Sequence, residues 1–184
     1  MKEGYRHISP NELAIKSCML GALVYNSGFK PDFMIALWRG GTAIGCYVHE
    51  LLEHKNVHVD HIAIRTSRQP DGSVVVHTLN YVTNNIKEGS KILIIDDVFD
   101  SGKSISAVIV KLTGESKIGS DKLDIRIATI FYKPKRNLTY RKPEYYVEET
   151  DEWLVFPHEV ENMTLEEITT FKGSEIGDIF KNLK

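Results

Sequence analysis

The sequence predicts an α/β fold with a mainly parallel, twisted sheet flanked by helices. Apolar segments of strand length alternate along the chain with longer segments of helical periodicity, and this order is typical of parallel sheets with right-handed connections. Three polar turns, at 39–41, 96–104 and 133–134, each follow an apolar segment. Because ligands of such sheets bind at the carboxyl ends of the strands, these turns are the candidate functional sites.

The first half of the chain predicts two helices and three strands. Ser9 is a suitable N-cap, Pro10 fits the first helical position and Glu12 completes a capping box, so a helix is expected to run to about residue 26. The apolar run 33–38 predicts a buried strand, and a helix is expected over 42–54. Alternating apolar residues predict a strand over 57–66. A turn-rich loop is expected over 67–72, and a returning strand over 74–79.

The second half continues the alternation. Residues 92–95 predict a buried strand, and residues 102–112 predict the helix that follows it. Further strands are expected over 123–132 and 144–147. Thr164 and Glu167 have the spacing of a second capping box, which predicts a late helix.

Composition excludes several classes of function. A chain of 184 residues suits one domain, and its net charge of −2 does not favour nucleic acid as a partner. No stretch approaches 18 apolar residues and the start has no apolar signal core, so no membrane span and no secretory leader are expected. Cys18 and Cys46 show neither metal nor disulfide spacing, and a reducing, cytoplasmic location is expected.

Residues 91–104, KILIIDDVFDSGKS, are the most specific part of the chain. An apolar strand is expected to end in Asp96 and Asp97, Asp100 follows, and a turn of small residues leads into a helix. Such a turn holds a phosphate on backbone N–H groups, and the acids beside it are suited to hydroxyl groups or a metal. The peptide therefore indicates a phosphorylated sugar as ligand.

Three alternatives explain this peptide less well. Gly102-Lys103-Ser104 suggests a nucleotide triphosphatase, but that motif needs a glycine where this chain has Asp97. Prenyl-diphosphate enzymes share the letters Asp-Asp-x-x-Asp, but they place these acids on a helix, whereas here they follow a strand. A solvated acidic turn needs neither three acids nor a glycine at the tip of a buried strand.

The peptide resembles the phosphoribosyl-diphosphate (PRPP) signature of the type I phosphoribosyltransferases, and the likeness spans roughly 33–159. It implies that family's fold as a single domain, 1–184, with a small hood and purine-binding part formed by about 1–28 and 134–184. In that family the two acids hold the ribose hydroxyls, directly or through Mg²⁺, and the small-residue loop wraps the 5-phosphate. By this resemblance the ribose-phosphate site comprises Asp96, Asp97, Asp100, Ser101, Gly102, Lys103 and Ser104.

Three further places resemble the 6-oxopurine branch of the family. Arg39 and Gly40 match its pyrophosphate-binding loop, in which the peptide bond before the arginine can be cis. Lys133 matches the lysine that donates to the purine 6-oxo group. Residues 151–159 match an Asp-x-Trp segment in which Trp153 would stack on the purine beside Leu154, and Glu159, in place of the usual Asp, would approach Mg²⁺. An ordinary turn, a solvated lysine and a core tryptophan are the alternatives.

The resemblance implies an enzyme that transfers the 5-phosphoribosyl group of PRPP to hypoxanthine, guanine or xanthine. Asp100 would accept the purine proton, Mg²⁺ would be the cofactor with Asp96, Asp97 and Glu159 as its ligands, and the chain would form a dimer or tetramer. Neither a nucleic-acid nor a membrane partner is expected. The alternatives are a regulator that senses PRPP or a nucleotide, and a phosphoribosyltransferase for another base. Loop 67–81 lacks the Ser-Tyr pair of many relatives, and its closure as a lid is left open.

Overall fold

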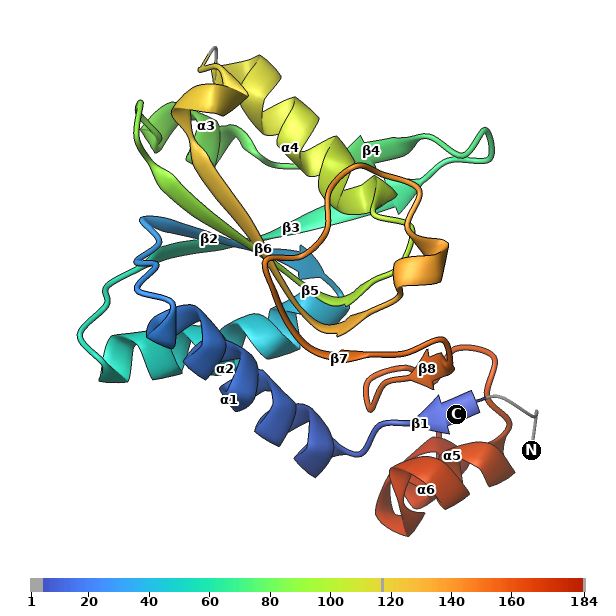
Figure 1. The fold of residues 1–184 in the computed structure, drawn as a ribbon. Helices are drawn as coiled ribbons and strands as arrows, with labels where there is room; N and C mark the ends of the chain where they lie inside the picture. Colours follow the sequence, from blue (N-terminus) through green and yellow to red (C-terminus); the bar gives the residue numbers. More distant parts are fainter. Residues whose placement is uncertain (1–4, 117, 184) are drawn as a thin grey trace. The chain divides into compact units, whose positions relative to one another are not determined.

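The computed structural model describes residues 5–116 and 118–183 (Figure 1). Its contacts divide the chain into two compact units. The larger unit is Lys16–Asp151, and the smaller one combines Met1–Ile15 with Glu152–Lys184. Each unit has a sheet of its own, so each is described separately.

The larger unit is built on a six-stranded sheet with the order β4-β3-β2-β5-β6-β7. Its strands are β2 (Phe33–Trp38), β3 (Asp60–Arg68), β4 (Val74–Val76), β5 (Lys91–Phe99), β6 (Asp124–Tyr132) and β7 (Tyr145–Glu149). Neighbouring strands pair in parallel, except that β4 runs antiparallel to β3. The predicted α/β class with a mainly parallel sheet is therefore confirmed.

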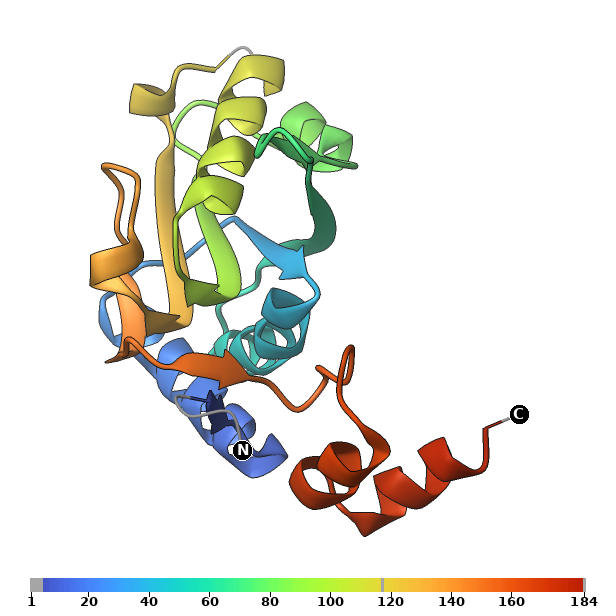
Figure 2. The same cartoon turned by 90° about the vertical axis from the view of Figure 1, so that its right-hand side faces the viewer.

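Helices cover both faces of this sheet. They are α1 (Pro10–Asn26), α2 (Gly40–His54), α3 (Asn80–Asn85) and α4 (Lys103–Ser116), with short 3-10 turns η1 (Ser120–Lys122) and η2 (Pro134–Arg136). Figures 1 and 2 show α2 and the part of α1 after residue 15 on one face, and α3 and α4 on the other. Among the described residues, no helix has both the length and the apolar character needed to cross a membrane.

The central strand β5 is buried on both faces, which explains its continuous run of apolar residues. Ile92 and Ile94 belong to the core cluster that includes Ile105 and Val108 of α4. Successive side chains of a strand point to opposite faces, so Leu93 between them, also fully buried, faces the α2 side. A strand buried in this way is typical of the centre of a parallel sheet.

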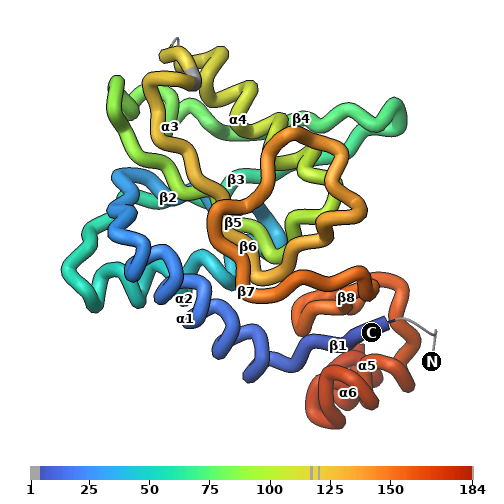
Figure 3. The backbone as a smooth tube through the Cα atoms, viewed as in Figure 1, coloured from blue at the N-terminus to red at the C-terminus, as the bar shows by residue number. Residues whose placement is uncertain are grey.

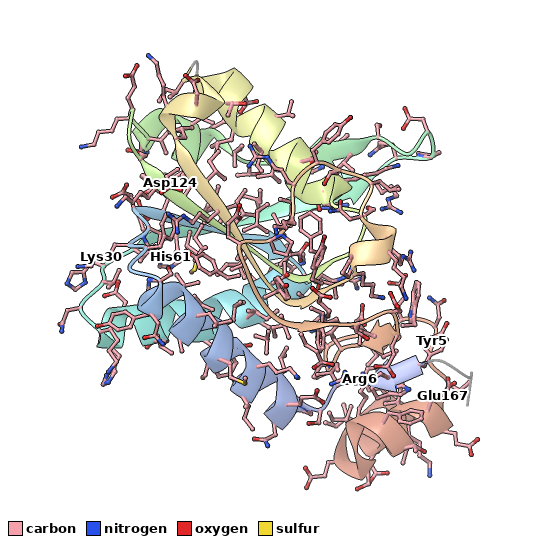
Figure 4. The ribbon with its side chains drawn as sticks, in the orientation of Figure 1. Tyr5, Arg6, Lys30, His61, Asp124 and Glu167 are labelled. Atoms are coloured by element: carbon pink, nitrogen blue, oxygen red, sulfur yellow. The ribbon has the colours of Figure 1, made fainter. Side chains whose placement is uncertain are left out.

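The smaller unit combines the two ends of the chain. β1 (Tyr5–His7) pairs in parallel with β8 (Trp153–Val155), and α5 (Leu165–Lys172) and α6 (Ser174–Lys181) follow. The rings of His7 and Phe171 stack with centroids 3.6 Å apart, and the Lys172 Nζ donates to the Phe156 carbonyl at 2.6 Å. Figure 4 labels Tyr5 and Arg6 on β1 and Glu167 on α5. These contacts tie β1 and α5 to the segment around β8.

Several predicted element boundaries are confirmed and others are wrong. The bounds expected for α1 and β2 match, Ser9 Oγ accepts the Glu12 N–H at 3.0 Å, and the capping box at Thr164 is present. β5 continues to Phe99, so Asp96 and Asp97 are strand residues and only Asp100 lies in the turn. β3 extends to Arg68, into the expected loop. The sequence did not predict four of the elements, which are β1, β8, α3 and α6. Each has only three to eight residues, and such short segments show little hydrophobic periodicity.

Candidate functional site

The three turns singled out in the sequence lie at one edge of the larger sheet. β2 and β5 are neighbours, with Ala36 opposite Ile95, and β5 pairs with β6 up to Phe99 opposite Tyr132. Just past that pair, the Lys133 N–H donates to the Phe99 carbonyl at 2.9 Å. The carboxyl ends of three adjacent strands therefore bring the Arg39 loop, the acids of β5 and Lys133 to one edge of the sheet, as predicted.

Asp96 and Asp97 form a pair of adjacent carboxylates at the end of β5. Asp96 Oδ1 accepts the Asp97 N–H at 3.0 Å, and Asp97 Oδ1 accepts the Val98 N–H at 2.7 Å. Burial, and next the charge of Asp97, raise the pKa of Asp96 well above its usual range. A bound divalent cation would offset the repulsion that makes ionisation of both groups costly.

This pair fits Mg²⁺ only together with a ligand that brings oxygen atoms of its own. Within residues 5–116 and 118–183, no group of three or more His, Cys, Asp or Glu side chains is placed to hold a metal ion. Mg²⁺ is commonly held by one or two carboxylates together with substrate phosphates. The carboxylate pair is therefore suited to an ion that arrives with a phosphorylated substrate.

The Arg39 loop packs directly against these acids. The Trp38–Arg39 peptide bond is cis, as the family resemblance implied, and α2 begins at the next residue. A Cβ atom on Gly40 would overlap the Asp97 carboxylate, and one on Gly41 would overlap the Ile95 carbonyl oxygen. The glycines are needed here because the loop lies in contact with the backbone and side chains of β5.

Replacing Gly41 by Ala should therefore destabilise the fold. The added methyl group meets backbone atoms of β5, which cannot rotate away, and we expect a loss of about 1–3 kcal/mol, the usual cost of overpacking. Gly114 of α4 is the matched control, since a Cβ there has no heavy atom within 4 Å. Gly114→Ala should stabilise the chain by roughly 0.5–1 kcal/mol. Thermal unfolding measures both, and an unchanged midpoint for Gly41→Ala would contradict the close approach.

The turn after β5 encloses a pocket of about 100 Å³. The pocket is lined by Arg68, Asp96, Val98, Phe99, Asp100, Ser101, Gly102, Lys103, Ser104 and Ile105. Gly102 has a φ of 73°, in the left-handed region that favours glycine, and α4 begins at the next residue. The first N–H groups of a helix lack partners within it and carry partial positive charge, so this pocket is suited to a phosphate group.

Asp100 is held by the segment that follows β6. Arg136 Nε lies 2.8 Å from Asp100 Oδ1, and the Leu138 N–H donates to the Ser101 carbonyl at 3.2 Å. Figure 3 shows this segment, in orange, returning alongside the turn between β5 and α4. The ion pair therefore holds the Asp100 carboxylate through its Oδ1 atom.

Lys133 is a buried cation at the end of β6, with 3% of its surface exposed. Burial lowers the pKa of Lys133, and the nearby Asp100 carboxylate acts in the opposite direction. The alternative of a solvated lysine is therefore wrong. A buried ammonium group is costly unless it has a function or a partner, and at this sheet edge it is suited to a ligand oxygen.

The other predicted purine and metal residues belong to the smaller unit. Trp153 is half exposed, with its ring centroid 6.0 Å from that of Tyr5, so a simple core role is wrong. Leu154 is buried. Glu159 Oε2 accepts the Phe156 N–H at 2.8 Å. Their roles toward a purine or a metal ion stay predictions.

Comparison with known proteins agrees with this arrangement. A family model described as a phosphoribosyl transferase domain matches residues 10–162, whereas no curated protein matches the chain. The structure is similar to a purine phosphoribosyltransferase from Pyrococcus horikoshii, with a TM-score of 0.67 and 24% identity over 88% of this chain and 98% of that one. It is also similar to a Helicobacter pylori xanthine-guanine-hypoxanthine phosphoribosyltransferase, with a TM-score of 0.65 and 22% identity over the same shares.

A third similar structure is a hypothetical protein from Neisseria gonorrhoeae with bound ppGpp, with a TM-score of 0.67 and 20% identity over 91% of this chain and 96% of that one. At these identities the structures establish the fold. The family model covers most of the sequence, including every residue of the β5 motif and the Arg39 loop. The chain therefore belongs to the phosphoribosyl transferase domain family.

Proposed function

We propose that this chain transfers the 5-phosphoribosyl group of PRPP to a 6-oxopurine, giving a purine nucleoside monophosphate and pyrophosphate. One observation carries the proposal: the carboxylate pair, the phosphate-sized pocket at the start of α4 and the buried Lys133 share one sheet edge. A sugar phosphate suits the carboxylate pair and the pocket, and a purine oxygen suits Lys133. Two similar structures, of a purine and of a xanthine-guanine-hypoxanthine phosphoribosyltransferase, support the same reaction.

In this proposal the residues of the β5 motif hold the ribose phosphate. Asp96 and Asp97 bind the ribose hydroxyls, and backbone N–H groups of 101–104 bind the 5-phosphate. The Arg39 guanidinium pairs with the pyrophosphate as it leaves, which stabilises the charge that develops there. Asp96 and Asp97 and, by the family resemblance, Glu159 would hold Mg²⁺, which would supply further positive charge for the pyrophosphate.

The proposal assigns a role toward the acceptor base to each of the residues that the family resemblance names. Lys133 donates to the 6-oxo group, which favours 6-oxopurines over adenine because an amino group would face the ammonium. Trp153 stacks on the flat base, a contact worth about 1–3 kcal/mol in related stacking sites, and Leu154 packs beside it. Asp100 accepts the purine proton as the ring nitrogen attacks the anomeric carbon.

A panel of bases tests the proposal directly. The chain is mixed with Mg²⁺, PRPP and hypoxanthine, guanine, xanthine or adenine, and nucleotide formation is followed by chromatography. We expect product with at least one 6-oxopurine and little with adenine. Turnover with adenine or a pyrimidine instead would identify a phosphoribosyltransferase for another base.

A binding measurement distinguishes the proposed enzyme from the remaining alternative. Calorimetric binding of PRPP without turnover of any base would favour a sensor of PRPP or of nucleotides. Because the similar protein from Neisseria gonorrhoeae has bound ppGpp, ppGpp belongs in this binding panel. The absence of both binding and turnover would overturn the proposed function.

The same proposal includes a single catalytic domain, a cytoplasmic location and a dimer or tetramer as the working form. Its hood and purine-binding part would be formed by about 1–28 and 134–184, which include Trp153 and Glu159. Sedimentation of the purified chain measures the oligomeric state.

A further inference from the structure

We propose that Arg68, which lies outside every recognised motif, binds the 5-phosphate of PRPP from the end of β3. The proposal rests on the proposed function and adds a residue to its phosphate site. Arg68 lines the same pocket as Asp100 and residues 101–105, although it lies 28 positions before Asp96 in the sequence. Arg68 therefore adds a positive charge to the pocket from outside the phosphate loop.

The backbone of Arg68 is fixed by the sheet. Arg68 is the last residue of β3 and pairs with Val74 of β4. The turn between the two strands is closed by the Gln69 N–H, which donates to the Ser73 carbonyl at 2.9 Å, and by the Gly72 N–H, which donates to the Gln69 carbonyl at 2.9 Å. A residue on such a strand is held more precisely than one on an open loop, so the side chain starts from a defined position beside the pocket.

The charges around the pocket leave Arg68 available for an anion. Asp100 is paired with Arg136 at 2.8 Å, so its charge is already offset. Within the part of the chain that the structure describes, neither Arg68 nor Lys103 takes part in an ion pair. Both line the pocket, and two cations match the charge of a phosphate dianion.

Arginine is suited to this position for a second reason. Its planar guanidinium group can bind two phosphate oxygens at once, in addition to the oxygens bound by the N–H groups of the phosphate loop. Arg68 would thus distinguish a 5-phosphorylated sugar from one with a free 5-hydroxyl group. It would act on binding of the sugar phosphate and leave the affinity for the base unchanged.

Calorimetry with ribose 5-phosphate, PRPP and pyrophosphate tests this assignment. For Arg68→Met we expect affinity for ribose 5-phosphate and for PRPP to fall by a similar factor of about 10–100, as for loss of a charged hydrogen bond, with pyrophosphate unaffected. Arg68→Lys should recover part of the loss. Lys111→Met is the control for charge, because Lys111 lies on α4 in a pair with Glu115 and does not line the pocket.

The outcomes also separate this inference from the proposed function. Equal affinity of Arg68→Met and the unchanged chain for ribose 5-phosphate overturns the assignment, and so does a loss confined to pyrophosphate and PRPP. Failure of the unchanged chain to turn over any base overturns the proposed reaction, while a loss of ribose 5-phosphate affinity in Arg68→Met would still support the phosphate contact. Circular dichroism of the variant excludes misfolding as the cause of weak binding.

Discussion

Replacing Asp100 by Asn is expected to lower turnover by about 10²- to 10⁴-fold, the usual contribution of a general base. Asn keeps the size of the side chain and an oxygen that accepts from Arg136, whose Nε lies 2.8 Å from Asp100 Oδ1, but its amide cannot accept the purine proton. PRPP affinity should change little, because the proposed phosphate contacts are backbone N–H groups and Arg68. Removing a negative charge from the pocket would, if anything, favour the phosphate dianion.

Steady-state kinetics with the preferred base and calorimetry with PRPP measure the two effects separately. Asp124→Asn is the matched control, since Asp124 pairs with Arg126 at 3.0 Å at the start of β6, the end of the strand away from the site, and its loss should leave turnover unchanged. An equal fall in turnover and in PRPP affinity for Asp100→Asn would argue for a binding role instead. That result would mean that another residue at this edge of the sheet is the general base.

The sequence predicted most of this site because its parts lie at strand ends. A buried parallel strand has a strong signal in the sequence, and the β5 motif follows the apolar run Ile92–Ile95, which is fully buried. The acids were expected in a turn, but β5 and β6 stay paired from Asp96 opposite Thr129 to Phe99 opposite Tyr132. Polar residues at the end of a strand look like a turn in the sequence, because pairing with a neighbour has no local signal.

The positions of two residues at the site could not be predicted from the sequence, for a different reason. Arg68 comes to the pocket only because β3 extends three residues past its neighbour β2, to which it pairs as far as Arg65. Arg136 reaches Asp100 only because the segment after β6 folds back onto the β5–α4 turn. Both placements depend on strand register and on the path of a loop. The spacing of residues in the sequence predicts neither of these. The segment around Trp153 had a recognisable pattern in the sequence. Its pairing with β1 could not be predicted, because the residues of β1 belong to no motif.

Replacing Lys133 by Met is expected to separate function from stability. Loss of the ammonium donor should lower kcat/KM for the 6-oxopurine by roughly 10- to 150-fold, since a hydrogen bond to a charged group is worth about 1.5–3 kcal/mol. KM for PRPP should remain close to its original value. Lys135→Met is the matched control two residues along, because Lys135 is exposed and pairs with Asp151 on the surface; it should change neither quantity appreciably.

The same variant should be at least as stable as the original chain at neutral pH. Burial lowers the pKa of Lys133 from 10.5, so between that lowered value and 10.5 the unfolded chain binds more protons than the folded one. Stability of the original chain therefore rises with pH across this window. Met has nearly the same volume and no charge to bury, so a gain of roughly 1 kcal/mol at pH 7 is expected.

Thermal unfolding at pH 7 and at pH 10 measures this effect. A gain of 1 kcal/mol corresponds to a midpoint about 2–4 °C higher for a chain of this size, and the gain should shrink at pH 10, where the ammonium of Lys133 is more easily neutralised. A lower midpoint for Lys133→Met would mean that the attraction between Lys133 and Asp100 outweighs the cost of burial. A higher midpoint with lost 6-oxopurine activity would mean that the chain keeps a destabilising cation in its core for the sake of the ligand oxygen.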